Sequence, residues 1–323
     1  MTEVFSLTEL AEAARSGDRG ILDRLDTVCS QAGYFGLTGL GLPAGLVEQV
    51  HARTIEFFAL PTAAKAALQS SDGDQFTGWK GQADNRNEFG LADLKEMFHI
   101  GPRADPALCS HDQVGAVPPT APGAGAGSPL WPAQLPGFAA SWHQYYREMQ
   151  RVAAELGVAL AAAIGISAAQ WLEMTAGNWA DLAANYYPAA TGSAPATRNA
   201  VHSDLTLFTI LYQDSGGGGG LHMQERDGRW QDVPPADGVF AVNVGELFTY
   251  LTSGRWWAVP HEVAAADPSA PGADTARISI PFFYRPADTR TISPLLVADD
   301  AERPAPLAVG RWVAERKRLT RTA

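Results

Sequence analysis

The sequence predicts an α+β fold in which a double-stranded β-helix, or jelly roll, forms the core. Helix-type patterns fill the first third of the chain, and from about residue 180 roughly six short β-type runs follow, separated by turn residues. We therefore expect a helical N-terminal region, 1–120, packed on a jelly-roll core with a C-terminal helix, 121–323. The two parts are expected to form one structural unit.

Capping residues and helix-breaking residues predict where the helices begin and end. SLTE, at 6–9, is a capping box and predicts that the first helix starts at Ser6. The second helix is expected over 19–32, before Gly33. Further helices are expected at 43–61, 136–165, 167–175 and 310–323, the last with basic residues toward its C-terminal end.

Two long segments are expected to be loops. Residues 70–90 are polar and punctuated by glycine, and 113–128 are rich in Pro, Gly and Ala. The second segment is interpreted as a surface loop and not as a domain linker. The first, with the C-terminal helix, is expected to lie over the mouth of the barrel.

Composition and charge narrow the class of partner. The chain has 323 residues, is 46% hydrophobic and carries a formal net charge of −11. An acidic surface repels phosphate, so no nucleic-acid partner is expected, and no apolar run is long enough to predict a membrane partner. With two cysteines and no signal-peptide pattern, a cytoplasmic location and a small-molecule partner are expected; the oligomeric state is not predicted.

The segment VHSDLTLFTILYQD, 201–214, places a histidine and a carboxylate in an apolar run. In a strand, residues two apart face the same way, so His202 and Asp204 are expected to point together into the core. Thr206, Phe208 and Ile210 share that face and are expected to line or floor the same cavity.

His261, in VPHEV, is the candidate third ligand. Two imidazoles and one carboxylate on one side of a metal leave positions open, which suits non-haem Fe(II) and O2 chemistry. Zinc with an open coordination site would accept the same ligands. The ligand types alone therefore do not choose between the two metals.

Arg277 and Ser279 indicate an acidic ligand. They share one face of the strand ARISIPFFYRP, and a buried arginine is costly unless it meets a carboxylate. Its planar fork fits a carboxylate bidentately, and the serine hydroxyl adds a hydrogen bond. A small dicarboxylate would satisfy this site; an ion pair with an internal Asp or Glu is the alternative.

Taken in order, these motifs resemble the isopenicillin N synthase-like family of Fe(II)/2-oxoglutarate-dependent dioxygenases. The resemblance runs nearly end to end and includes LKEMFHIG, NYYP, HSD, QDSGGGGGLHMQ, VNVGELFTYLTSGRW, PHEV and RIS. The distal histidine lies 261 − 204 = 57 residues after the aspartate, and the arginine 277 − 261 = 16 residues further on, as is usual for the family. Glu262 stands where the family usually has arginine.

The resemblance implies the cofactors and the roles of the site residues. The cofactors would be Fe(II), 2-oxoglutarate as cosubstrate, and O2, with hydroxylation or desaturation of a small molecule and release of succinate and CO2. The metal ligands would be His202, Asp204 and His261. The 2-oxoglutarate site would be formed by Arg277, Ser279, Asn185 and Tyr187. Retention of Asp204 argues against halogenation.

The substrate is less specified. VFSLTELAEAA, YFGLTGLGL and QFTGW are similar to deacetoxycephalosporin C synthase, but DLAANYYP lacks the arginines that bind a penicillin carboxylate there. A natural-product or antibiotic-biosynthesis role is expected by analogy. Expected substrate contacts are Trp79, Arg86, Asn87, Phe208 and Trp257.

Two other functions remain open from the sequence. An iron oxidase of the same fold would need no 2-oxoglutarate and would use the arginine and serine for a substrate carboxylate. A non-catalytic jelly-roll protein would bind a small acid or a metal. Oxygen consumption with Fe(II), with and without 2-oxoglutarate, distinguishes the three.

Overall fold

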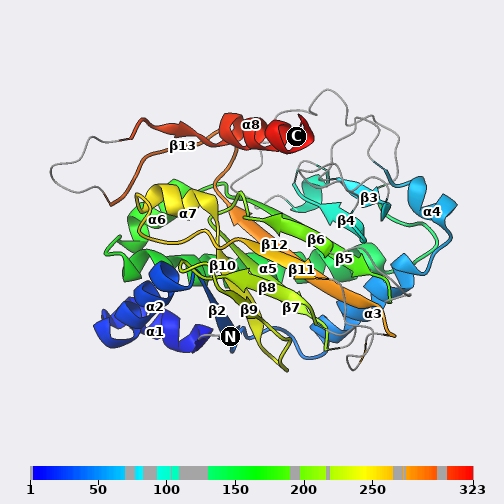
Figure 1. Ribbon diagram of the computed structural model, residues 1–323, viewed down its shortest axis with the longest axis horizontal. Coiled ribbons are helices and arrows are strands. Elements are labelled where there is room, and N and C mark those ends of the chain that lie inside the picture. Colours follow the sequence, from blue (N-terminus) through cyan, green and yellow to red (C-terminus); the bar gives the residue numbers. More distant parts are fainter. Residues whose placement is uncertain are drawn as a thin grey trace.

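Two main β-sheets, a small two-stranded sheet and the helices around them form the described part of the molecule (Figure 1). The computed structural model describes residues 3–69, 77–82, 93–102, 104–108, 130–189, 197–215, 219–264, 272, 274–296 and 304–322, with side chains of the last helix up to residue 316. The expected loop 113–128 and most of 70–90 lie outside these ranges. The architecture agrees with the predicted α+β jelly roll.

The larger sheet has eight strands, all antiparallel to their neighbours except for the parallel pair β1 and β2. In spatial order they are β1 (Val4–Ser6), β2 (Tyr34–Thr38), β10 (Phe240–Val244), β7 (Phe208–Gln213), β12 (Arg277–Arg285), β5 (Trp179–Tyr187), β4 (Glu96–Ile100) and β3 (Gly78–Lys80). The N-terminal region is therefore not only helical, because it supplies four strands to this sheet.

The smaller sheet has four antiparallel strands. In order they are β6 (Thr197–His202), β11 (His261–Ala264), β8 (Leu221–Gln224) and β9 (Trp230–Asp232). A separate pair joins β13 (Thr291–Ile292) and β14 (Leu307–Ala308). Side chains from the larger and smaller sheets line one cavity between them.

Most predicted helices form within a few residues of their expected bounds. The helical elements are α1 (Leu7–Ser16), α2 (Arg19–Gln31), α3 (Leu46–Phe58), α4 (Thr62–Ala66), the 3-10 turn Pro106–Leu108, α5 (Phe138–Ala163), α6 (Ala168–Thr175), α7 (Glu246–Leu251) and α8 (Val309–Thr322). Ser6 does precede α1, but its side chain makes no capping hydrogen bond. Among the helices described, none combines the length and apolarity needed to cross a bilayer.

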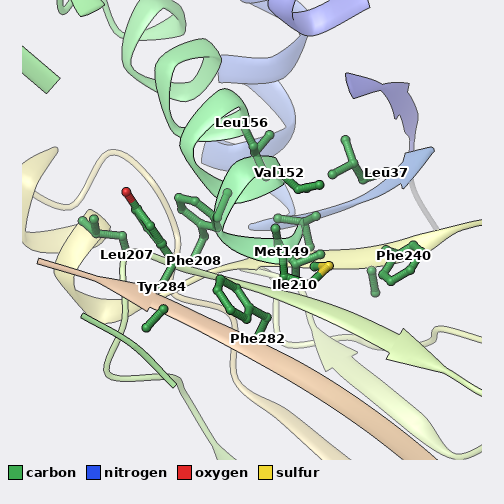
Figure 2. Close-up of a cluster of buried hydrophobic side chains, with 14 of the residues drawn as sticks. Leu37, Met149, Val152, Leu156, Leu207, Phe208, Ile210, Phe240, Phe282 and Tyr284 are labelled. Carbon is green, nitrogen blue, oxygen red and sulfur yellow. The ribbon is translucent and has the colours of Figure 1, made fainter. Parts of the chain in front are cut away.

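The main hydrophobic core lies between α5 and one face of the larger sheet. Figure 2 shows Met149, Val152 and Leu156 of α5 above Phe208 and Ile210 of β7. On β12, Phe282 and Tyr284 face the same core, and the Phe208 and Tyr284 rings stack at 5.0 Å. Side chains alternate along a strand, so the residues between these ones face the cavity.

The segment 201–213 is two strands and not one. Strand β6 ends at His202 and β7 begins at Phe208, with a turn over 203–207 between them, and the two strands lie in different sheets. The expectation that Asp204 shares a strand face with His202 is therefore wrong in its reasoning. The turn, and not strand alternation, sets where the Asp204 carboxylate points.

Candidate active site

Three side chains converge where the smaller sheet meets the turn 203–207. His202 ends β6, His261 begins β11, and the two residues are direct cross-strand partners. The Asp204 Oδ1 atom lies 3.9 Å from His202 Nε2 and 3.8 Å from His261 Nε2. One donor atom from each residue lies within 4.8 Å of the other two, a spacing that allows a single metal ion to be shared.

Hydrogen bonds outside the triad orient each donor atom. The Nδ1 atom of His202 lies 2.8 Å from the Ala200 carbonyl oxygen, and that of His261 lies 3.1 Å from the Val259 carbonyl oxygen. A carbonyl only accepts, so each Nδ1 carries the proton and each Nε2 presents its lone pair to the shared space. This is the tautomer that a metal requires.

The Asp204 carboxylate is held through its other oxygen. Thr209 Oγ1 donates to Oδ2 at 2.5 Å and Asn243 Nδ2 donates to it at 2.8 Å. Both partners are buried, and both come from the larger sheet. Their bonds leave Oδ1 directed toward the two imidazoles.

Helix α7 supports the turn that carries Asp204. The backbone N–H groups of 245–247 donate to carbonyl oxygens of the turn 203–207 at 2.8 to 3.0 Å, so the helix N-terminus and the turn satisfy each other. Ser203 Oγ also donates to the Glu246 carboxylate at 2.7 Å, and Arg316 of α8 pairs with the same carboxylate. Glu246 thereby connects the turn 203–207, which carries Asp204, to the C-terminal helix α8.

Electrostatics favour the metal-binding protonation states of Asp204 and His202. Burial raises the pKa of Asp204, but electrostatic attraction to His261 and His202, with the hydrogen bonds from Asn243 and Thr209, outweighs it and lowers the pKa overall. Partial removal from water, followed by repulsion from His261, lowers the pKa of His202. An anionic carboxylate and a neutral His202 imidazole are the forms that result at neutral pH.

A cavity extends from the triad between the two sheets. From the larger sheet it is lined by Asn185, Tyr187, Thr209, Leu211, Asn243, Arg277, Ser279, Pro281 and Phe283. From the smaller sheet and the turn it is lined by Asn199, His202, Asp204, Leu221, Met223, His261 and Val263. The structure thus brings the predicted metal ligands and all four predicted 2-oxoglutarate residues into one cavity.

Arg277 is completely buried and only partly satisfied. Its Nη2 atom donates to Gln213 Oε1 at 2.7 Å, and its guanidinium lies over the Tyr187 ring at 5.0 Å. Its Nε and Nη1 atoms have no hydrogen-bond partner among the described residues. The partner seen is a neutral carboxamide, so the alternative of an internal ion pair with Asp or Glu is not what the described residues form.

The register between β12 and β5 determines which side chains surround the Arg277 guanidinium. Arg277 pairs with Tyr187, and Ser279 pairs with Asn185, across β12 and β5. Asn185 Nδ2 and Ser279 Oγ lie 3.5 Å apart. Four polar or aromatic side chains therefore face one end of the cavity from two adjacent strands.

The side chains of β7 that face the cavity are not the expected ones. Phe208 and Ile210 pack into the hydrophobic core, Thr206 is buried within the turn 203–207, and none of the three lines the cavity. Thr209 and Leu211 line it instead. The five-residue turn, 203–207, shifts the alternation that a single continuous strand would have kept.

The other expected substrate contacts were Trp79, Arg86, Asn87 and Trp257. Trp79 is buried in β3, where its Nε1 donates to Glu96 at 2.8 Å. Trp257 Nε1 donates to the Gln224 carbonyl oxygen at 3.2 Å, and neither tryptophan lines the cavity. Arg86 and Asn87 lie outside the described residues.

Glu262 lies on the outer face of the smaller sheet. His261 and Val263, on either side of it, line the cavity, so Glu262 faces the other way. It stands directly opposite His222 of β8, with Oε1 and Nδ1 3.6 Å apart. Glutamate in place of the usual arginine thus interacts with a neighbouring strand and does not disturb the ligand.

Sequence reasoning missed Asn243 and Thr209 as supports of Asp204. Asn243 is the polar residue inside the apolar run FAVNV of β10, and an amide at a buried strand position needs a partner. That was the available signal for it. Thr209 gave none, because threonine is common in strands.

We predict that His202→Ala, Asp204→Ala and His261→Ala each abolish stoichiometric binding of Fe(II) or Co(II), because each removes one of only three donors. Metal titration measures this, and thermal unfolding checks that the fold survives. His222→Ala, in the same sheet but facing outward, is the matched control and should bind metal normally. If a triad variant binds the metal as tightly as the wild type does, the residue replaced in that variant is not a metal ligand.

We predict that Asn243→Leu weakens metal binding by about 10–100-fold, because a similar volume is kept while the bond that orients Asp204 is lost. Thr209→Val, which removes the other bond, should act in the same direction. Competition titration with Co(II) measures the affinity. Unchanged affinity in both variants would show that the Asp204 carboxylate needs no such support.

Comparison with known proteins agrees with this geometry. A model of the 2OG-Fe(II) oxygenase superfamily matches residues 178–286, and a model of the N-terminal region of the non-haem dioxygenase in morphine synthesis matches residues 3–120. The chain is 28% identical over 288 residues to validamycin A dioxygenase of Streptomyces hygroscopicus subsp. limoneus, covering 84% of this chain and 74% of that protein. It is 25% identical to the proline hydroxylase buaE of Petromyces alliaceus, over 92% of each.

Solved structures share the fold. A full-length Neurospora crassa protein, crystallised in complex with alpha-KG and thymine, matches with a TM-score of 0.81 at 20% identity over 99% of this chain and 97% of that chain. A 2OG-Fe(II) oxygenase family protein of Caulobacter crescentus matches with a TM-score of 0.79 at 21% identity, over 98% and 97%. Because the two family matches fall in succession on the helical region and on the strands that build the cavity, the chain belongs to the 2-oxoglutarate- and Fe(II)-dependent oxygenases and is a 2-oxoglutarate-dependent dioxygenase.

Proposed function

We propose that this cavity binds Fe(II) and 2-oxoglutarate side by side and oxidises a small organic molecule at its open end. The metal ligands in this proposal are His202, Asp204 and His261. The 2-oxoglutarate ligands are Arg277, Ser279, Asn185 and Tyr187. The observation that carries the proposal is a fully buried arginine with two unsatisfied donor atoms in the same cavity as the triad.

The donor set fits a ferrous ion. Two imidazole nitrogens and one carboxylate oxygen converge from one side, and they leave the side toward the cavity for other ligands. Zinc would accept these donors too. A dicarboxylate site beside the metal has no evident use for zinc, whereas Fe(II) and 2-oxoglutarate are the cofactors of the family.

The arginine site fits the distal carboxylate of 2-oxoglutarate. Burying N–H donors without a partner costs about 1–3 kcal/mol or more when the group is charged, and a carboxylate would remove that cost. Ser279 lies on the same cavity face as Arg277 and offers a further donor. Asn185 and Tyr187, on the neighbouring strand, are placed to contact the rest of the molecule.

The protein residues position and protect the reactants. When bound, Fe(II) would activate O2, which is the oxidant: 2-oxoglutarate would give two electrons and become succinate and CO2, and the substrate would give the other two and be hydroxylated, or be desaturated with release of water. The triad fixes the metal, and Arg277 fixes the cosubstrate relative to it. Apolar side chains around the metal, including Leu221, Met223 and Phe283, reduce the access of water.

Substrate reaches the site most directly past His202, whose side chain is 40% exposed while that of His261 is 12% exposed. Relatives are named for validamycin A and for proline hydroxylation, which supports a small, natural-product substrate and a role such as antibiotic biosynthesis for this chain. The low cysteine content supports a cytoplasmic location.

The direct test of the proposed function is oxygen consumption by the Fe(II)-loaded protein. We expect slow uptake of O2 with formation of succinate when 2-oxoglutarate is present, even before the substrate is known, and none without it. A 2-oxoglutarate-independent oxidase would consume O2 with its substrate alone. A non-catalytic binding protein would form no succinate under either condition.

We predict that Arg277→Lys weakens 2-oxoglutarate binding by ~1–3 kcal/mol while Fe(II) affinity stays unchanged, because lysine keeps the charge but loses the planar fork. Titration calorimetry under anaerobic conditions measures both. Arg285→Lys is the matched control, since Arg285 is also buried on β12 but pairs with Asp288 and does not line the cavity. Equal 2-oxoglutarate affinity in the Arg277 variant and the wild type would make that arginine structural.

A further inference from the structure

Gln213 touches the buried guanidinium from outside the cavity. It is the last residue of β7, is 8% exposed and does not line the cavity. Its Oε1 atom accepts from Arg277 Nη2 at 2.7 Å, and its Nε2 atom donates to the Val233 carbonyl oxygen at 3.3 Å. Both ends of the carboxamide are therefore engaged.

These two bonds fix which way the carboxamide faces. The Val233 carbonyl only accepts, so the amide nitrogen must face it and the oxygen must face Arg277. The backbone on either side is fixed as well. Gln213 pairs in register with Ser279, and the Asp214 carboxylate accepts from the Ile278 N–H at 2.9 Å while the Asp214 N–H donates to the Ile278 carbonyl at 3.1 Å.

The hydrogen-bond partner of Arg277 is the neutral carboxamide of Gln213, and this affects the net charge of the cavity. A carboxylate at this position would neutralise Arg277 and compete with an acidic ligand, whereas a carboxamide takes one N–H and leaves the positive charge in place. A second buried arginine, Arg198, lies close enough that Arg277, after burial itself, lowers its pKa. The carboxamide of Gln213 therefore leaves the guanidinium charge of Arg277 available to an acidic ligand.

We propose that Gln213 is a positioning residue that sets how tightly, and at what length, the cavity accepts a 2-oxo dicarboxylate. It holds the Arg277 fork at a fixed place along β12, and so at a fixed distance from the metal triad, without neutralising it. A dicarboxylate of matching length spans the two, and a longer one does not. This inference rests on the proposed role of Arg277 in binding 2-oxoglutarate.

A merely structural Gln213 would give a different pattern. Its bond to Val233 joins β7 to the residue after β9, so loss of the side chain could lower stability alone. In that case thermal stability would fall while the relative affinity for different dicarboxylates stayed the same. Selectivity between dicarboxylates is the readout that separates positioning from stability.

The experiment compares Gln213→Glu and Gln213→Leu with the wild type and with Gln49→Glu, an exposed change of the same charge. Each full-length protein is loaded with Fe(II) under anaerobic conditions and titrated with 2-oxoglutarate and with 2-oxoadipate, which is one methylene longer. Iron affinity and thermal unfolding are measured alongside.

We expect Gln213→Glu to weaken 2-oxoglutarate binding by about tenfold or more, because a carboxylate on Arg277 Nη2 would neutralise the guanidinium charge that attracts the ligand. Gln213→Leu should bind 2-oxoglutarate more weakly and discriminate less against 2-oxoadipate, with iron affinity unchanged. If the glutamate variant does not fold, the leucine variant carries the test through its change in selectivity.

Wild-type affinity and selectivity in both variants would overturn the inference and leave the proposed function standing. A loss of thermal stability with unchanged selectivity would overturn it as well, by assigning Gln213 a structural role. If the wild type itself did not bind 2-oxoglutarate, the proposed function and this inference would fail together.

Discussion

A buried positive charge at the wall of the central cavity decides what that cavity can hold. Arg277 is 0% exposed, and its described hydrogen-bond partner is a neutral amide. Such a buried charge is tolerated when an anion neutralises it, and the cavity provides room for one next to the three side chains that are proposed to bind the metal. The proposed metal site and the proposed carboxylate site thus share one cavity between the two sheets.

Strand alternation keeps this polar space separate from the hydrophobic core. On β12, Phe282 and Tyr284 pack toward α5, while Arg277 and Ser279 face the cavity from the same strand. One face of the larger sheet therefore packs into the hydrophobic core, and the opposite face lines the cavity of the proposed active site. A shift of one residue in register would bury the arginine among aromatic rings, so folding and function require the same register.

Much of this arrangement is predictable from the sequence, and the failures have physical causes. The two imidazoles, the carboxylate and the Arg-x-Ser pair are recognisable because charged groups in apolar strands need a reason to be there. The sequence did not reveal which side chains of β7 face the cavity. The turn at 203–207 separates Asp204 from Phe208, so the alternation of side chains along β7 does not continue from β6. Gln213 and Asn243 act through other side chains, and contacts between distant strands leave no local pattern. Trp79 and Trp257, expected as substrate contacts, do not line the described cavity, and both indoles hydrogen-bond elsewhere.

One cavity is proposed to hold the metal and 2-oxoglutarate together, with Arg277 as the anchor of the far carboxylate. An anaerobic crystal structure of the Fe(II)- and 2-oxoglutarate-bound protein tests this claim most directly. We predict iron on His202, Asp204 and His261, and the C5 carboxylate on the Nε or Nη1 donors of Arg277. A 2-oxoglutarate molecule bound elsewhere, with Arg277 paired to a carboxylate of the protein itself, would contradict it.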